Sequence, residues 1–206
     1  MNDAFVTRWQ AAPIRTLDIE GRLAQMLRPE TLAHVRRVAD FARILAEHHG
    51  VNPDRAELAA LLHEVAAPYS DEQLLALAEY YEIPISRTEA LVPELIHGKV
   101  GAEILHNEWA INDEELLNAV RHHVAGAEHM GATEKVIFLA DKLEPARDRF
   151  YNDLDPIRAL ALDDLDAAVA SMAVWRDVEL PTPNEYVRDR FAVAENSMAD
   201  LARTNF

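Results

Sequence analysis

The chain has 206 residues, no cysteine, and 36 Asp and Glu against 20 Lys and Arg, which gives a formal net charge of −16. Nucleic acids and anionic membranes bind clustered Lys and Arg, so neither is expected as a partner. The missing cysteines exclude disulfides, thiolate zinc sites and iron–sulfur clusters, so any metal would be held by His and carboxylates. No apolar run approaches the roughly 18 residues of a membrane span, and we expect a cytoplasmic protein.

Proline and glycine fall between long segments of helical periodicity, which predicts an all-α, single-domain helical bundle. We expect helices over residues 30–49, 53–66, 70–81, 98–109, 112–124, 132–143, 156–177 and 183–203. Residues 1–20 are expected to form an N-terminal extension, 21–180 the main domain, and 181–206 a C-terminal helix packed on it. The apolar segment 167–175 suits either core packing or the face of a homodimer.

Local signals support these boundaries. Asn52-Pro53 and Asp155-Pro156 each place a capping residue before a first-turn proline. Two pairs, Ser70 with Gln73 and Asn112 with Glu115, have the spacing of a capping box. Gly50 is expected to end the helix that starts near residue 30 in a left-handed conformation.

Five predicted helices each place an ionisable residue in their apolar stripe. Spacings of three and four residues align these stripes on one helix face: His34 with Val38, Phe41 and Leu45; His63 with Ala56 and Ala60; His97 with Gly101 and Ile104; His123 with Leu116 and Val120; and Asp141 with Ile137 and Phe138. Glu64 follows His63 directly. A single histidine in such a stripe is more often a hydrogen-bonded core residue than a ligand, but five helices repeat the arrangement.

Burying an ionised carboxylate without a partner costs about several kcal/mol of folding free energy. These residues therefore need a shared partner. We therefore predict one or two divalent metal ions held by His34, His63, Glu64, His97, His123 and Asp141. Six donors exceed the four of a structural zinc site, which favours a catalytic centre. Neutral imidazole and carboxylate suit Fe, Mn, Zn or Co. The other histidines, His48, His49, His106, His122 and His129, fit surface or helix-end positions better.

Other catalytic motifs are absent from the sequence. His63-Glu64 begins a zincin pattern, but Ala67 occupies the place of its second histidine, and neither a glycine-rich nucleotide loop nor a nucleophile elbow occurs. All three lysines, Lys99, Lys135 and Lys142, fall in one third of the chain near the predicted ligands. Their position suggests a local anion-binding site, and chance clustering of three lysines is an equally good explanation.

These residues resemble the HD superfamily of metal-dependent phosphohydrolases. More narrowly, the blocks HVRRVADFARILAEHHGV, ELAALLHE, LIHGKVGAEI, LLNAVRHHVAG and EKVIFLADKLEPARD resemble the symmetrical bis(5'-nucleosyl)-tetraphosphatase family over roughly residues 25 to 180. The resemblance implies an HD-type helical bundle, the same six ligands, a preference for iron, and a nucleotide or dinucleoside polyphosphate substrate. It also implies phosphate contacts from Lys142 and Arg147; Lys99 is added because it lies next to His97.

The chain departs from the family pattern at three places, of which one is His122-His123-Val124-Ala125-Gly126, where the family has a Tyr-His-Thr-Thr-Gly block. Glu64 stands where the family has Asp, and Ala67 where it commonly has Lys. The activity implied is hydrolysis of a nucleotide phosphoanhydride, with symmetrical cleavage of diadenosine tetraphosphate to two ADP as the leading hypothesis. Glu64 and Asp141 would then orient the attacking water. The alternatives are a non-catalytic regulator that binds nucleotide or metal, an HD phosphohydrolase for another nucleotide, and a plain helical bundle.

Overall fold

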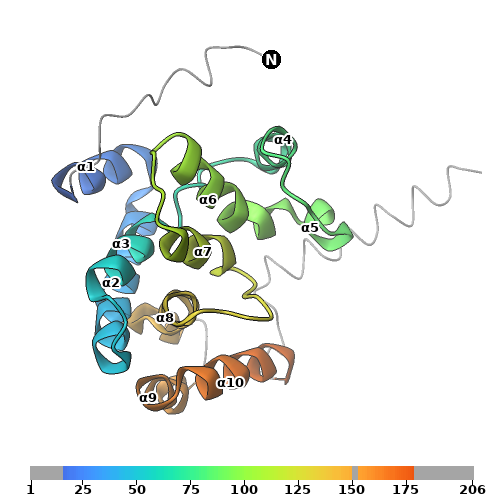
Figure 1. The fold of residues 1–206 in the computed structure, drawn as a ribbon. Coiled ribbons are helices and arrows are strands. Elements are labelled where there is room, and N and C mark those ends of the chain that lie inside the picture. Colours follow the sequence, from blue (N-terminus) through green and yellow to red (C-terminus); the bar gives the residue numbers. More distant parts are fainter. Residues whose placement is uncertain (1–15, 150–152, 179–206) are drawn as a thin grey trace, which may run out of the picture.

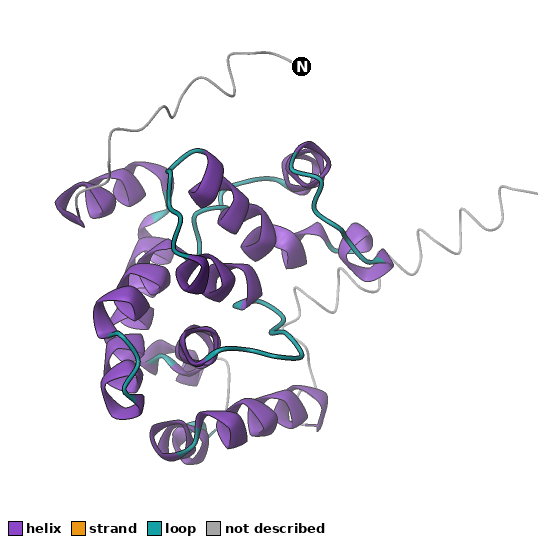
Figure 2. Ribbon diagram, viewed as in Figure 1, coloured by secondary structure: helices purple, strands orange, loops and turns teal. Residues whose placement is uncertain are grey.

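The computed structural model describes residues 16–149 and 153–178, and within them the chain is helical, with loops and no strand (Figures 1 and 2). The α-helices are α1 (Thr16–Met26), α2 (Pro29–His49), α3 (Pro53–Leu62), α4 (Asp71–Tyr80), α5 (Arg87–Leu91), α6 (His97–Asn107), α7 (Glu114–His122), α8 (Ala132–Leu143), α9 (Asp155–Asp163) and α10 (Leu165–Val178). Two 3₁₀ turns, η2 (Pro93–Ile96) and η3 (Pro145–Arg149), precede α6 and follow α8. The predicted all-α class is confirmed.

Several helix ends have the chemistry that the sequence predicted. The side chain of Asn52 accepts hydrogen bonds from the amides of Asp54 and Arg55 at the start of α3, and Ser70 forms a capping box with Gln73 at the start of α4. Gly50 ends α2 with φ 66°, and its amide donates to the carbonyl of Ala46. A left-handed residue here lets the chain turn sharply into α3.

Other boundaries differ from the prediction. Asp113, not Asn112, caps α7, because its side chain accepts from the amide of Leu116. Leu154 occupies the cap position of α9, and Asp155 lies in the first turn. The helix expected over 156–177 is two helices, because Asp164 takes an extended conformation between α9 and α10.

Helices α1 and α5 and the two 3₁₀ turns were not predicted from the sequence. Helix α1 begins at Thr16, so the extension expected to end at residue 20 shares its last residues with a helix. Ile19 and Leu23 of this helix are buried in the hydrophobic core. The helix expected over 183–203 lies outside the described residues.

The core lies where α2, α3, α7 and α8 meet. Helix α2 packs against α3 and α8, while α7 packs against α6, α8 and α3 (Figure 1). Helices α9 and α10 pack against each other and against α8, and Ala168 and Met172 of α10 are buried. The described part of segment 167–175 therefore contributes to the core.

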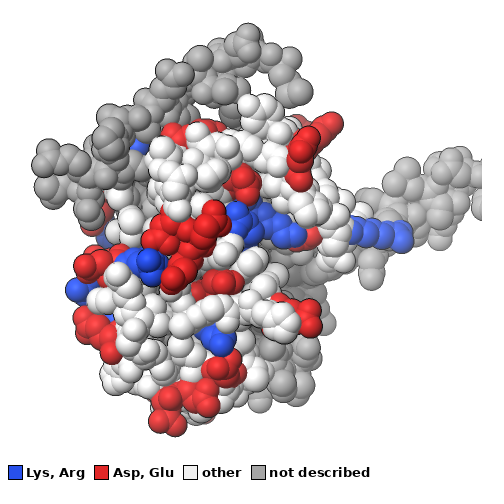
Figure 3. Space-filling view, viewed as in Figure 1, with Lys and Arg blue, Asp and Glu red and all other residues white. Residues whose placement is uncertain are grey.

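The surface carries the acidic excess of the composition. Figure 3 shows Asp and Glu spread over the face in view, with Lys and Arg next to several of them. In the described part of the chain, no helix combines the length and the apolar character that crossing a membrane requires.

Candidate metal centre

Three histidines stand at helix ends and are oriented by backbone carbonyls. His63 follows the last residue of α3, His123 follows the last residue of α7, and His97 is the first residue of α6. Each points its Nδ1 at the carbonyl oxygen three residues earlier, at 2.6 Å from Ala60, 2.7 Å from Val120 and 2.6 Å from Glu94, respectively. The C-terminal ends of α3 and α7 leave such carbonyls without intrahelical partners, whereas the carbonyl of Glu94 also accepts from the amide of His97. When Nδ1 of a neutral ring donates its hydrogen to the carbonyl, Nε2 carries a lone pair and no hydrogen.

The three Nε2 atoms point into one small volume. Those of His97 and His123 lie 2.9 Å apart. His63 and His123 have ring centroids 4.8 Å apart, and both side chains are buried. The Nε2 atom of His63 is buried with no hydrogen-bond partner. A buried polar atom without a partner is costly, so the atom marks a place where a further group is needed.

Two carboxylates and a fourth histidine complete the cluster. The Nε2 atom of His34 lies 3.1 Å from Oδ1 of Asp141, which in turn lies 3.9 Å from Nε2 of His63. Glu64 places Oε1 3.6 Å from Nε2 of His63 and Oε2 3.6 Å from Nε2 of His97. The longer side chain of Glu64 therefore reaches the centre of the cluster. The five residues selected from helix phase and Glu64, which follows His63, thus lie together.

The electrostatics hold His63, His123 and Asp141 in the forms that bind metal, whereas at His34 the hydrogen bond and charge of Asp141 outweigh burial and raise the pKa. Burial lowers the pKa of His63, and burial together with the neighbouring His63 and His97 rings lowers the pKa of His123 well below its ordinary value. Burial acts to raise the pKa of Asp141, but the charges of Lys142 and Arg147 outweigh it and hold that pKa well below the usual range. Neutral imidazoles and an ionised carboxylate are the ligating forms.

The donor set fits a divalent cation. Two groups of three donors have atoms within 4.8 Å of one another, His34 with His63 and Asp141, and His63 with Glu64 and His123. Ligands about 2.1 Å from a metal at roughly tetrahedral or octahedral angles are about 3.0–3.4 Å apart, close to the shortest separations seen here. The C-terminal ends of α3, α7 and α8 also meet at the cluster, and their dipoles favour a cation.

A cavity of about 920 Å³ opens beside the cluster and includes His34, Glu64 and His97 in its wall. Four arginines and six carboxylates line it, and the carboxylates are Glu30, Glu64, Asp71, Glu72, Glu94 and Glu144. The arginines are Arg28 at the start of α2, Arg37 one turn beyond His34, and Arg147 and Arg149 of η3. Guanidinium groups suit phosphate oxygens, because they donate two parallel hydrogen bonds.

The three residues expected to contact phosphate are placed differently from one another. Arg147 lines the cavity and donates to Oδ1 of Asp141 at 2.6 Å. Lys142 donates to the carbonyl of His123 at 2.6 Å and lies over the ring of Phe138, so it supports the cluster from behind the cavity wall. Lys99 forms a 2.7 Å ion pair with Glu89 and is not part of the cavity wall. Tertiary packing gives Lys99 a carboxylate partner that its proximity to His97 in the sequence did not reveal.

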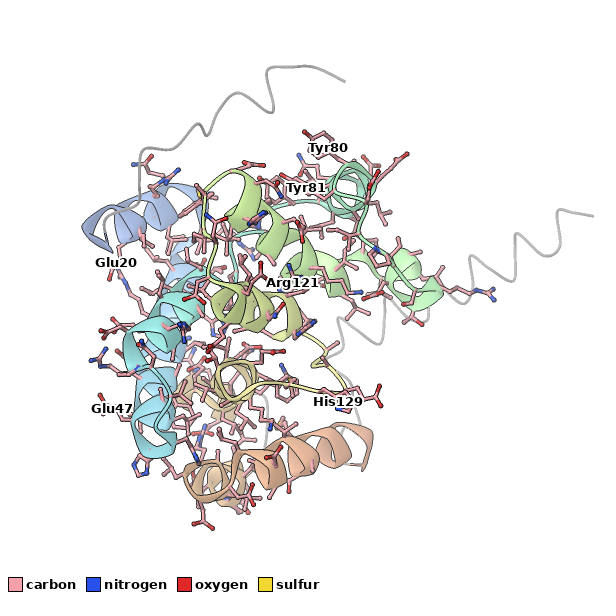
Figure 4. The ribbon with its side chains drawn as sticks, in the orientation of Figure 1. Glu20, Glu47, Tyr80, Tyr81, Arg121 and His129 are labelled. Carbon is pink, nitrogen blue, oxygen red and sulfur yellow. The ribbon has the colours of Figure 1, made fainter. Side chains whose placement is uncertain are left out.

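The histidines assigned to the surface lie outside the cluster. His122 binds Oε2 of Glu134 through Nδ1 at 2.6 Å, although it is the neighbour of His123 in the chain. His129 is exposed in the loop between α7 and α8 and points away from the bundle (Figure 4). Arg121, labelled in the same view, pairs with Glu103 of α6 at 3.1 Å.

Two residues of the site escaped the sequence analysis, Glu144 and Arg37. Glu144 is buried, with 2% of its area exposed, and contacts both Nδ1 of His34 and the guanidinium of Arg37. Burial acts to raise the pKa of Glu144, but hydrogen bonds from Arg37, the Ala146 amide and His34 outweigh it and lower that pKa. A signal was available: Glu144 follows Asp141 by three residues and Arg37 follows His34 by three, which puts each pair on one helix face.

An all-α bundle that gathers four histidines and two carboxylates in one cluster is the arrangement of an HD-domain phosphohydrolase, and the HD domain family matches residues 31–146. The chain is 34% identical to "Bis(5'-nucleosyl)-tetraphosphatase, symmetrical" of Bacillus subtilis (strain 168), over 70% of this chain and 76% of that protein. It is 36% identical to the protein of the same name from Staphylococcus aureus, over 68% and 71% of the two chains. The chain therefore belongs to the symmetrical bis(5'-nucleosyl)-tetraphosphatase family of HD-domain, metal-dependent phosphohydrolases.

Solved structures support the same fold. A predicted HD superfamily hydrolase involved in NAD metabolism from Clostridium acetobutylicum superposes with a TM-score of 0.73 at 25% identity, over 81% of this chain and 89% of that one. The HD domain of an L. monocytogenes phosphodiesterase, solved with cyclic-di-AMP, superposes with a TM-score of 0.53 at 16% identity, over 91% and 100% of the two chains. The second likeness concerns the fold alone.

Proposed function

We propose that the protein hydrolyses diadenosine tetraphosphate symmetrically, so that water adds across the central P–O–P bridge and two ADP are released. The observation that carries the proposal is the buried, unpartnered Nε2 of His63, at the centre of a His and carboxylate cluster beside an arginine-lined cavity. The substrate is taken from the names of the relatives that align over most of the chain.

One or two divalent ions would be held by His34, His63, Glu64, His97, His123 and Asp141, with iron favoured by the family resemblance. A bound divalent cation lowers the pKa of a coordinated water and neutralises charge on phosphoryl oxygens. Glu64 and Asp141 would orient the attacking water, because their carboxylates lie among the histidine Nε2 atoms and close to the cavity. Each can accept a hydrogen bond from that water.

The cavity arginines would bind the phosphate chain. Arg37 and Arg147 are each held by a carboxylate of the site, so their guanidinium groups are already oriented before substrate arrives. Arg28 and Arg149 add two further guanidinium groups to a wall that also carries six carboxylates. Preorganised cations beside the reacting phosphates stabilise the charge that develops in the transition state. Lys142 acts through the His123 carbonyl and Asp141 rather than by touching phosphate.

The test combines metal analysis with product analysis. Protein purified without chelator or polyhistidine tag is analysed for metals and then incubated with diadenosine tetraphosphate, and the nucleotides are separated. We expect bound metal and ADP as the sole nucleotide product, and we expect His63→Ala to lose both. ATP plus AMP would contradict symmetrical cleavage.

The same sample separates the alternatives. A panel of mononucleotides and a cyclic dinucleotide tests for another HD phosphohydrolase activity. Bound metal with no turnover of any nucleotide would favour a regulator. Full metal content and activity in His63→Ala would overturn the assignment of the site.

A further inference from the structure

The orientation of His34 is achieved differently from that of the other three histidines of the cluster. His63, His97 and His123 direct Nδ1 at backbone carbonyls. His34 lies in the second turn of α2 and directs Nδ1 at a side chain, with Oε1 of Glu144 3.2 Å away. Its Nε2 faces Asp141 at 3.1 Å. A carboxylate can be changed by mutation without changing any ligand, whereas a backbone carbonyl cannot.

Glu144 uses both of its oxygens as acceptors. Oε1 accepts from Nδ1 of His34 and from Nη2 of Arg37 at 3.1 Å. Oε2 accepts from Nε of Arg37 and from the amide of Ala146, both at 2.7 Å. An ionised carboxylate offers about four acceptor sites and no donor, so four donors match its capacity. The side chain links a residue of the metal cluster to an arginine of the cavity wall.

We propose that Glu144 is a positioning residue that holds His34 in the Nδ1–H tautomer, leaving Nε2 free to bind metal, and that fixes Arg37 at the cavity wall at the same time. The inference rests on the proposed metal site and adds a residue to it. The buried Glu144 side chain would then orient both a metal ligand, His34, and an arginine of the cavity wall, Arg37. Outer-shell carboxylates on ligating histidines set ring orientation and tautomer in this way.

The variant Glu144→Gln tests the proposal because it keeps the size of the side chain. An amide offers one oxygen acceptor and one NH₂ donor, so it cannot accept from the donors on both sides. If its oxygen serves Arg37 and the Ala146 amide, its NH₂ faces Nδ1 of His34. His34 must then carry its proton on Nε2, where it blocks metal binding.

The matched control is Glu134→Gln. Glu134 also binds a histidine Nδ1, that of His122 at 2.6 Å, and accepts from the amide of Gly131 at 3.1 Å. His122 lies outside the metal cluster. A change of its tautomer should therefore leave the metal ligands and the metal affinity unchanged. Arg37→Gln is the second comparison. It removes the guanidinium that binds Glu144 and keeps the contact between Glu144 and His34.

The experiment titrates metal-stripped proteins with Co²⁺ and follows visible absorption, alongside kcat and KM for diadenosine tetraphosphate. We expect Glu144→Gln to bind Co²⁺ roughly 10- to 100-fold more weakly than wild type and to raise KM as well. Glu134→Gln should match wild type in both, and Arg37→Gln should raise KM while keeping Co²⁺ affinity. Wild-type Co²⁺ affinity in Glu144→Gln would overturn the inference. No Co²⁺ binding by the wild-type protein would overturn the metal site itself, and the inference with it.

A measurement on the unmutated protein covers the case in which Glu144→Gln does not fold. Nitrogen-15 NMR of the metal-free wild-type protein distinguishes the two neutral tautomers of each imidazole. We expect His34 to carry its proton on Nδ1. Asp141 lies 3.1 Å from Nε2, so that atom can carry a second proton in the metal-free protein; a His34 ring without a proton on Nδ1 would contradict the proposal whatever the behaviour of the variants.

Discussion

The Nε2 atoms of His97 and His123 lie 2.9 Å apart, although each ring already directs its Nδ1 at a backbone carbonyl. A neutral imidazole has a single N–H, so with Nδ1 protonated both Nε2 atoms present lone pairs to each other. Two facing lone pairs need a cation or a shared proton to be stable. Burial lowers the pKa of His123 and so disfavours the proton, and a metal cation between the two atoms would satisfy both lone pairs.

Adjacent histidines at the end of α7 give a direct test of this requirement. We expect His123→Ala to lower metal affinity by more than the roughly 100-fold that follows loss of an outer-shell partner, and to lose activity with it. His122→Ala removes a hydrogen bond to Glu134, which costs about 1–2 kcal/mol of stability, and should retain metal. Metal analysis, activity and urea unfolding of the two variants make the comparison. Equal metal loss in both would contradict the assignment.

Glu64 stands where the family has Asp, and the structure predicts how the site depends on its length. Its two carboxylate oxygens each lie 3.6 Å from a histidine Nε2, on His63 and on His97. Shortening the side chain by one methylene withdraws the carboxylate by about a bond length. We expect Glu64→Asp to reduce kcat/KM by about tenfold or more, the scale of effect for a displaced catalytic group. A rise in activity would mean that the natural residue impairs turnover.

Gly98 is required by the packing of α6 against α7. A Cβ at this position would lie 2.8 Å from the carbonyl oxygen of Val120 and 3.0 Å from Nδ1 of His123. We expect Gly98→Ala to destabilise the protein by about 1–3 kcal/mol, the usual cost of overpacking, and to weaken metal binding by displacing His123. Gly21 in α1 has nothing within 4 Å of such a Cβ, so Gly21→Ala should be neutral or stabilising by up to about 1 kcal/mol. Urea unfolding and Co²⁺ titration test both variants, and a fully stable Gly98→Ala would rule out the close approach.

Asp113 predicts a specific dependence of stability on pH. Burial acts to raise the pKa of Asp113, but hydrogen bonds from Arg55 and from the first amides of α7 outweigh it and lower that pKa below its ordinary value of 3.8. A depressed pKa in the folded state means that the group stabilises the fold above 3.8, and that this contribution is lost as the pH falls through the folded-state pKa. The side chain is 39% exposed, so solvent screening limits the contribution to about 0.2–1 kcal/mol.

The variant Asp113→Asn isolates this charge, because Asn still caps a helix. We expect it to be less stable than wild type at neutral pH, and the difference in unfolding free energy to shrink in the acid range. Urea unfolding of both proteins at a series of pH values measures that difference, and high salt should reduce it at neutral pH. A difference that grows as the pH falls would show that Asp113 is not stabilised in its ionised form.

Helical periodicity selected the four histidines and Asp141 of the cluster. Residues three and four apart lie on one face of a helix, so His123 could be separated from His122 by its phase with Leu116 and Val120 alone. The structure agrees, since Leu116, Val120 and His123 are buried and His122 binds Glu134 nearer the surface. Local chemistry likewise predicted the C-terminus of α2 and the N-termini of α3 and α4, because caps depend on residues a few positions apart; the end of α3 at Leu62, four residues before the expected one, was not predicted.

Contacts between distant segments were beyond the sequence. His97 and His123 meet because α6 approaches α7 closely at Gly98, and helix phase does not say which helices are neighbours. The ion pair of Lys99 with Glu89, and the place of Arg28 and Arg149 in the cavity wall, depend on where long side chains find carboxylates or open space after packing. The sequence alone determined which residues face the core, because that follows from the period of the helix. Only the tertiary structure decided which of them touch, because that follows from how the helices cross.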